Sequence, residues 1–206
     1  MTVRATDATV EYPEVTALDG VSLSVDPGEL VLLAGPNGGG KTTFLDVVSR
    51  RLRLDGGSVD VEGDVGRGFQ EPRVFDGLTV DGNARLFDCD EDVLERLSLD
   101  RVGHQRAGDL STGTRKKLDV AAAFAGEPDV LVLDEPLADL DDVSRAIVTS
   151  LVSDHVERDG AALVATHRIR EFEGLDRVVV LVDGAVEAVL EGDAEDVHRR
   201  YVDLLS

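Results

Sequence analysis

The stretch that decides the fold reads Gly35-Pro36-Asn37-Gly38-Gly39-Gly40-Lys41-Thr42. An apolar run at residues 30–34 precedes it, and residues 44–52 carry apolar side chains at helical spacing, so the order is strand, glycine loop, helix. Glycines let consecutive backbone N–H groups turn inward on a phosphate, and Lys41 can neutralise charge on the β and γ phosphates. The Thr42 hydroxyl can ligate Mg²⁺. We therefore expect a binding loop for a nucleoside triphosphate.

A second element downstream combines a buried strand with two carboxylates. Residues 130–133 are apolar throughout, and Asp134, Glu135 and Pro136 follow them. Side chains alternate along a strand, so the two neighbouring carboxylates point in different directions. Asp134 can hold Mg²⁺ through water, and Glu135 can act as general base on the attacking water. Together with the glycine loop, this pair predicts hydrolysis of the bound nucleotide.

The rest of the chain alternates between strand and helix patterns. Short apolar runs at residues 129–133, 161–165 and 178–182 predict buried strands, and residues 142–156 have a helical pattern. Such alternation is typical of an α/β fold with a mostly parallel sheet. The other expected elements are strands within 2–34, at 58–62 and at 65–69, helices at 80–87, 92–97 and 111–125, a hairpin at 178–190 and an amphipathic helix at 194–205.

The residues upstream of Asp134 indicate which class of nucleotide-hydrolysing protein this is. They read Leu110-Ser111-Thr112-Gly113-Thr114, followed by Arg115-Lys116-Lys117-Leu118. This run resembles the signature sequence of ABC ATPases, Leu-Ser-Gly-Gly-Gln, except that Thr112 replaces a glycine and Thr114 replaces the glutamine. Ser111 can cap the helix that it opens, and the Gly113 N–H at the helix N-terminus can face an anion.

The resemblance to ABC ATPases extends from Tyr12 to the C-terminal strands and implies further site residues. Gln70 resembles the Q-loop residue that senses Mg²⁺ and couples to the helical subdomain. Asp141 resembles the D-loop aspartate that crosses to the partner subunit. His167 resembles the switch histidine that contacts the γ-phosphate, and Tyr12 lies where the family places an aromatic ring to stack on adenine.

The resemblance thus implies a complete site and fold. It assigns catalysis to Lys41, Gln70, Glu135 and His167. It assigns nucleotide contacts to Tyr12, Gly35, Asn37, Gly38, Gly39, Gly40, Lys41, Thr42, Thr43, Ser111, Gly113 and Asp141. It assigns contacts to Mg²⁺ to Thr42, Gln70 and Asp134, with ATP as the nucleotide. The implied fold is a P-loop NTPase of ABC type over residues 1–206, with an N-terminal antiparallel β subdomain and a helical subdomain at about 71–126.

The resemblance also implies partners. Two subunits would pack head to tail, as a homodimer or with a related ATPase subunit, and clamp each ATP between the phosphate-binding loop of one and Ser111 and Gly113 of the other. Closure on ATP and opening after hydrolysis would drive a separate integral membrane permease. We favour export, because residues 110–117 resemble small export-type ATPases and no C-terminal extension typical of many import ATPases is seen.

Two functions other than transport are compatible with an ABC-type nucleotide site. A soluble ABC-type ATPase, such as one for iron–sulfur assembly, is the alternative expectation. A module that only senses nucleotide is disfavoured, because Glu135 and His167 are both present.

The net charge of the chain restricts the kinds of molecule that it is expected to bind. The 206 residues include 42 acidic and 21 basic side chains, a formal net charge of −21. Nucleic acid and anionic lipid would be repelled, so neither is expected as a general partner. Lysine occurs only at positions 41, 116 and 117, and all other basic residues are arginine. This bias resembles proteins of halophilic archaea, whose molar internal salt screens self-repulsion.

Signals for membrane insertion, disulfides and histidine metal sites are weak. Apolar runs stop after about five residues, far below the roughly 20 that a spanning helix needs, and residues 1–7 lack a secretory pattern. We therefore expect a cytoplasmic protein that is peripheral on the inner face of the cell membrane through its permease. Cys89 is the only cysteine, and the four histidines lack the spacing of metal ligands.

Overall fold

The computed structural model describes residues 2–205, and its core is a six-stranded sheet. The strands are β3 (Leu30–Ala34), β5 (Val65–Gly68), β6 (Val130–Asp134), β7 (Ala161–Ala165), β8 (Arg177–Val182) and β9 (Ala185–Leu190). Their order is β5-β6-β7-β3-β8-β9, with β9 antiparallel to β8 and all other neighbours parallel. The central position of β3 places the glycine loop in the middle of the carboxyl edge of the sheet.

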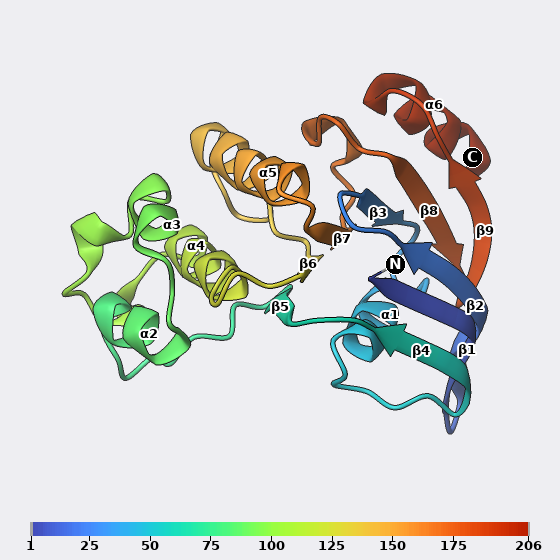
Figure 1. The fold of residues 1–206 in the computed structure, drawn as a ribbon, viewed down its shortest axis with the longest axis horizontal. Helices are drawn as coiled ribbons and strands as arrows, with labels where there is room; N and C mark the ends of the chain where they lie inside the picture. Colours follow the sequence, from blue (N-terminus) through green and yellow to red (C-terminus); the bar gives the residue numbers. More distant parts are fainter. Residues whose placement is uncertain (1, 206) are drawn as a thin grey trace.

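A smaller antiparallel sheet is built from β1 (Val3–Tyr12), β2 (Val15–Val25) and β4 (Gly56–Val61), in the order β2-β1-β4. In Figure 1 this sheet and α1 (Lys41–Val48) lie together below the larger sheet. The two sheets share a core with α1. The N-terminal residues therefore form a layer that packs against the part of the molecule that carries the glycine loop.

Each face of the six-stranded sheet has its own apolar core. All five residues of β3 are buried, and alternate ones belong to different clusters: Leu30, Leu32 and Ala34 to one, Val31 and Leu33 to the other. The first cluster continues into α5 (Asp142–Glu157), α6 (Ala194–Leu205) and the helical lobe. A strand buried on both faces reads as an unbroken apolar run, which explains the sequence pattern.

The helical lobe contains α2 (Val80–Phe87), α3 (Glu91–Arg96) and α4 (Thr112–Ala123), with 3₁₀ turns at Asp100–Val102 and Ala107–Asp109. It lies at the far left of Figure 1, and α4 runs back from it toward β5 and β6. The start of α4 is fixed by Ser111, whose hydroxyl accepts a hydrogen bond from the Thr114 N–H. The signature resemblance therefore falls on a genuine helix N-terminus.

The predicted α/β fold, with a mostly parallel sheet and an antiparallel N-terminal sheet, is confirmed. Helix and strand ends differ from the predictions by a few residues; for example, the helix predicted at 111–125 ends at Ala123. The two lobe turns and a third 3₁₀ turn at Ile169–Glu171 were not predicted, because so short a segment has no helical periodicity. Within residues 2–205, no helix is both long and apolar enough to cross a membrane.

Candidate nucleotide-binding and hydrolysis site

The glycine loop joins β3 to α1 and has backbone geometry that only glycine adopts without strain. Gly35 has φ +138°, and a Cβ atom there would collide with the Leu181 carbonyl oxygen. Gly40 has φ +99°, and its Cβ would lie 2.7 Å from the Ala17 carbonyl oxygen. The loop thus leads directly into the N-terminus of α1, where unpaired N–H groups and the helix dipole favour an anion.

Lys41 is buried at the start of α1 and folds back over the loop. Its Nζ donates hydrogen bonds to the carbonyl oxygens of Gly35 at 2.7 Å and Pro36 at 2.9 Å. Burial lowers the pKa of this ammonium, while Glu135 and Asp134 act in the opposite direction. The two carbonyls hold the ammonium in place at the base of the loop.

The carboxyl ends of β3, β6 and β7 meet beside this loop. The last residue of β6, Asp134, pairs with Ala165 at the end of β7, and its Oδ2 accepts a 2.8 Å hydrogen bond from the Thr42 hydroxyl. The resulting pocket has a volume of about 600 Å³. Its lining residues are Asn37, Gly38, Gly39, Gly40, Lys41, Thr42, Thr43, Gln70, Asp134, Glu135, Ala138 and His167. The fold therefore gathers most of the predicted nucleotide-binding and catalytic residues in one pocket, called here the phosphate pocket.

Glu135 occupies a strained backbone conformation, with φ +45°. Its Oε1 lies 3.5 Å from Nε2 of His167 and is buried without a hydrogen-bond partner among the described residues. Burial raises the pKa of the Glu135 carboxyl; the charge and the backbone N–H of His167 oppose that rise. A carboxylate with a raised pKa and a free oxygen is suited to accept a proton.

The oxygen donors of the phosphate pocket fit Mg²⁺. The Thr42 hydroxyl and the Asp134 carboxylate are within hydrogen-bond distance of each other, and Gln70 lines the same pocket. In the described chain, no group of three or more His, Cys, Asp or Glu side chains is arranged to hold a metal. Such a site suits an ion that takes its remaining ligands from phosphates and water.

Ser111, Gly113 and Asp141 lie in a second pocket of about 420 Å³, called here the signature pocket. The Ser111 hydroxyl also shares a 2.8 Å hydrogen bond with the Thr114 hydroxyl. Asp141 caps α5, because its Oδ1 accepts a 2.7 Å hydrogen bond from the Ser144 N–H, and this bond lowers the pKa of the carboxyl. Among the described residues, none lines both pockets. The structure therefore places most of the predicted nucleotide contacts in two separate pockets.

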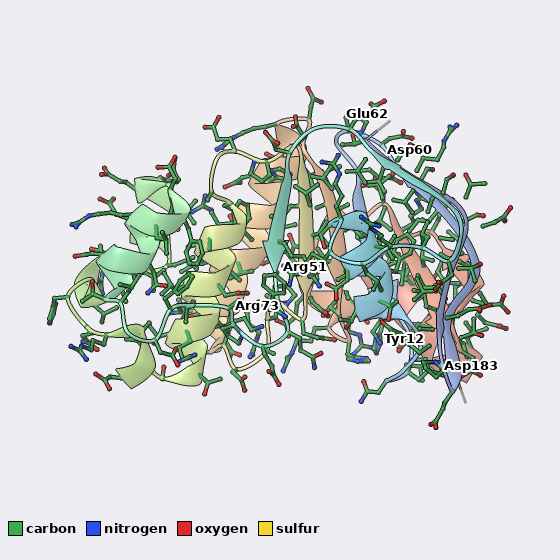
Figure 2. All side chains as sticks on the ribbon, turned by 90° about the horizontal axis from the view of Figure 1, so that it is seen from below. Tyr12, Arg51, Asp60, Glu62, Arg73 and Asp183 are labelled. Atoms are coloured by element: carbon green, nitrogen blue, oxygen red, sulfur yellow. The ribbon has the colours of Figure 1, made fainter. Side chains whose placement is uncertain are left out.

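Tyr12 and Gly35 line neither pocket. Tyr12 ends β1, pairs with Val15 of β2, and is 48% exposed (Figure 2). The same β2 strand supplies Ala17, whose carbonyl oxygen closes off Gly40. Tyr12 is thus an accessible aromatic ring on a hairpin that borders the glycine loop.

Three charged residues near the site, each with a side chain that is little exposed, were not predicted. Arg67, on β5, places Nη2 3.6 Å from Asp134 Oδ2 and 3.2 Å from Asp46 Oδ1, with its side chain only 8% exposed. Lys116 and Asp119, on α4, bind the backbone around Gln70. In the sequence, the scarcity of lysine is the one feature that distinguishes Lys116, which lies beside the signature residues. No local sequence pattern distinguishes Arg67 or Asp119.

A family model described as "ABC transporter" matches residues 18–138. A putative ABC transporter ATP-binding protein of Halobacterium salinarum is 36% identical, over 91% of this chain and 91% of that protein. The doxorubicin resistance ATP-binding protein DrrA of Mycobacterium tuberculosis is 32% identical over 92% of this chain, which spans 64% of DrrA. The sulfate/thiosulfate import ATP-binding protein CysA of Bradyrhizobium diazoefficiens is 33% identical over 96% of this chain, which spans 65% of CysA.

Solved structures agree with the fold. The ATP-binding subunit of an ABC transporter superposes with a TM-score of 0.87 at 22% identity and covers 100% of both chains. A dimeric bacterial ABC transporter cassette superposes with a TM-score of 0.82 at 24% identity, over 92% of this chain and 98% of that one.

Proposed function

This chain belongs to the ABC transporter family as an ATP-binding subunit with ATPase activity, and from that premise we propose that two such subunits hydrolyse ATP at their interface to drive a membrane permease. The observation that carries the proposal is the separation of the phosphate pocket from the signature pocket. The phosphate pocket holds seven of the twelve expected nucleotide contacts and the signature pocket three, and no described residue lines both. A head-to-tail pair would bring the phosphate pocket of one subunit against the signature pocket of the other, twice over.

Within the phosphate pocket, each side chain has a distinct task. Lys41 binds the β and γ phosphates, because a buried ammonium at the end of a glycine loop is a strong partner for an oxyanion. Glu135 takes a proton from the attacking water through its free Oε1. His167, 3.5 Å away, orients that carboxylate and contacts the γ-phosphate. Gln70 lines the same pocket, where its side chain would contact the metal.

Thr42 and Asp134 are the residues that would hold Mg²⁺ together with Gln70. A bound Mg²⁺ supplies positive charge to the phosphate oxygens. Asp134 is fixed for this task by Thr42 and by the nearby guanidinium of Arg67. The exposed ring of Tyr12 would stack on the adenine, a contact of about 1–3 kcal/mol.

The helical lobe is the surface where we place the permease. It exposes apolar side chains in a strongly acidic chain: Phe75 is 54% exposed, Leu78 38% and Leu86 56%. Phe75 also stacks on Phe87, with ring centroids 5.8 Å apart. Exposed apolar side chains grouped on one lobe are suited to bind a partner protein.

We propose export as the direction of transport, on the resemblance of residues 110–117 to export-type signatures. The relatives include DrrA, named for drug resistance, and CysA, named for import. Both have similar identity to this chain, so a transport assay in vesicles with the captured permease is the deciding measurement.

The dimer proposal is tested by Glu135→Gln. The amide keeps the shape of the carboxylate but cannot accept the proton, so the turnover number should fall by about 10²- to 10⁴-fold. Binding of ATP remains, and the protein should therefore accumulate as an ATP-bound dimer. Size-exclusion chromatography with light scattering, with ATP and with ADP, measures the mass.

Lys41→Ala in the Glu135→Gln background is the matched control, because it removes phosphate binding without altering the signature pocket. This double variant should stay monomeric with ATP. A Glu135→Gln protein that remains monomeric at saturating ATP would contradict the shared-site mechanism.

The permease is tested by affinity capture of the chain from its own membranes, in high salt and mild detergent. We expect an integral membrane protein with several spanning helices to co-purify. Recovery of soluble assembly proteins alone would point instead to the iron–sulfur alternative.

A further inference from the structure

The loop at residues 69–73, called here the Gln70 loop, leaves β5 for the helical lobe and is held at both ends by α4. Lys116 Nζ donates hydrogen bonds to the carbonyl oxygens of Phe69 at 2.6 Å and Gln70 at 2.7 Å. Asp119, one turn further along α4, accepts hydrogen bonds from the N–H groups of Phe69 and Arg73, each at 2.8 Å. All four bonds involve a charged side chain, and such bonds are stronger than neutral ones.

These two side chains are buried, with exposed fractions of 1% for Lys116 and 2% for Asp119. Burying charged groups is costly unless they are paired and hydrogen-bonded, so a displaced loop would leave both charges unsatisfied. The Gln70 loop is therefore held to one position relative to α4. A movement of the Gln70 loop relative to α4 would break these hydrogen bonds.

The ring of Phe69 reinforces this connection from the other side. The guanidinium groups of Arg51, Arg67 and Arg73 lie 4.9, 5.0 and 4.6 Å from its centroid. Figure 2 shows Arg51 and Arg73 together between the helical lobe and the sheet core. Arg67 in turn reaches Asp134 in the phosphate pocket. The Gln70 loop thus contacts α4 through Lys116 and Asp119, and contacts the phosphate pocket through Phe69 and Arg67.

The N-terminal end of α4, about one turn before Lys116, belongs to the signature pocket. Ser111 caps the helix and Gly113 lies in its first turn, so an anion bound there acts on the same rigid helix that carries Lys116 and Asp119. One helix therefore joins the signature pocket to the Gln70 loop.

We propose that Lys116 and Asp119 are positioning residues, called here the α4 clamp, which fix Gln70 according to the orientation of α4. In the dimer of the proposed function, on which this inference rests, a nucleotide held by the partner's phosphate pocket contacts Ser111 and orients α4. The clamp then carries that orientation to Gln70 of the subunit's own phosphate pocket. Each nucleotide site therefore promotes hydrolysis at the other.

The choice of lysine at position 116 agrees with this role. Lysine is otherwise confined to Lys41 and Lys117, although the chain uses arginine freely. A compact ammonium can donate to two adjacent carbonyl oxygens, as Lys41 does to Gly35 and Pro36, whereas a planar guanidinium suits carboxylates and phosphates. Lys41 and Lys116 each donate to two backbone carbonyl oxygens, and each thereby holds a loop that contributes residues to the phosphate pocket.

The test uses the full chain in high salt, with Lys116→Met and with Lys116→Met/Asp119→Leu. The double variant replaces both buried charges by apolar groups, which avoids leaving one charge unpaired. We expect binding of a fluorescent ATP analogue to the monomer to be unchanged. The turnover number should fall by about 10- to 100-fold, as for other positioning contacts, and the Hill coefficient for ATP should fall toward 1.

A direct reading of the loop is available because the chain contains no tryptophan. Glu71→Trp places a single fluorophore in the Gln70 loop without altering a residue of either pocket. With the clamp intact, ATP-dependent dimer formation should shift its emission. The same measurement is made with Lys116→Met/Asp119→Leu added, in the Glu135→Gln background that accumulates the ATP-bound dimer. There the emission shift of the tryptophan should be lost although the dimer still forms.

Asn83→Ala is the matched control. Asn83 is equally buried in the same lobe, but its side chain holds Phe75 and Thr79 instead of the Gln70 loop. It should lower the melting temperature as the clamp variants do, yet keep the emission shift, the turnover number and the Hill coefficient.

Two outcomes would overturn the clamp. One is a folded clamp variant with normal cooperativity and a normal emission shift, and the other is an equal loss in Asn83→Ala. If the parent chain itself shows neither hydrolysis nor ATP-dependent dimers, the proposed function fails instead.

Discussion

Cys89 shows how a single residue is controlled by its surroundings. It follows α2, and burial, aided by the charge of Asp88, raises the pKa of its thiol from 9.0 to about 11. The thiolate is the reactive form, so this higher pKa lowers the thiolate fraction, and with it the alkylation rate, by about 100-fold. We expect iodoacetamide at about pH 8 to label the folded protein far more slowly than the protein in denaturant. Mass spectrometry of a time course measures both rates, and equal rates would refute this description of the site.

Residues at the phosphate pocket differ in how far they need tertiary support. Lys41 and Thr42 belong to one contiguous loop and helix, so their geometry follows from local sequence. Glu135 and His167 come from the ends of different strands and meet at 3.5 Å only because β6 and β7 are neighbours. The proximity of this proposed catalytic pair therefore depends on the order of the strands in the sheet.

At the scale of elements, the end of α5 carries a histidine that makes its packing sensitive to acid. His155 lies edge-on to Phe124, and its Nε2 is 3.2 Å from the Ala161 carbonyl oxygen at the start of β7. Burial lowers the pKa of His155, and Arg158 adds to this, while the Ala161 carbonyl and Asp129 oppose it. The fold thus favours the neutral ring.

The sign of the pH effect follows from this lowered pKa. The unfolded chain binds a proton first, so folding stability is complete above the unfolded pKa near 6.5 and is lost as the pH falls toward the lower folded value. We expect His155→Gln to flatten the decline in melting temperature between about pH 7.5 and about pH 5.5. His104→Gln, at an exposed histidine, is the control and should leave the decline unchanged.

At the scale of the whole molecule, the net charge of −21 opposes compaction. A Debye length of about 3 Å at 1 M salt screens most of this repulsion. We expect the melting temperature to rise between about 0.1 M and about 3 M KCl; a gain of about 2 kcal/mol in unfolding free energy would raise it by about 4–8 °C. Sucrose at equal osmolarity separates screening from a general solute effect. Equal melting temperatures at the low and the high KCl concentration would exclude charge repulsion as a limit on stability.

The α/β class, the glycine loop at residues 35–42 and the pair Asp134 and Glu135 could be predicted from the amino-acid sequence alone. These features depend on contiguous residues, since apolar runs define buried strands and glycines define the loop. Ser111 could also be assigned from its neighbours, because a helix cap is a local interaction.

Which of these segments meet depends on contacts between residues far apart in the chain. Lys116 reaches Gln70 across 46 positions of the chain, and Asp119 reaches Phe69 across 50. Arg67 lies beside Asp134 because β5 and β6 are paired, and no local pattern announces that contact. The division into phosphate and signature pockets likewise follows from where α4 packs against the sheet. Periodicity specifies which face of an element is buried, but the partner of that face is selected by the packing of the whole core.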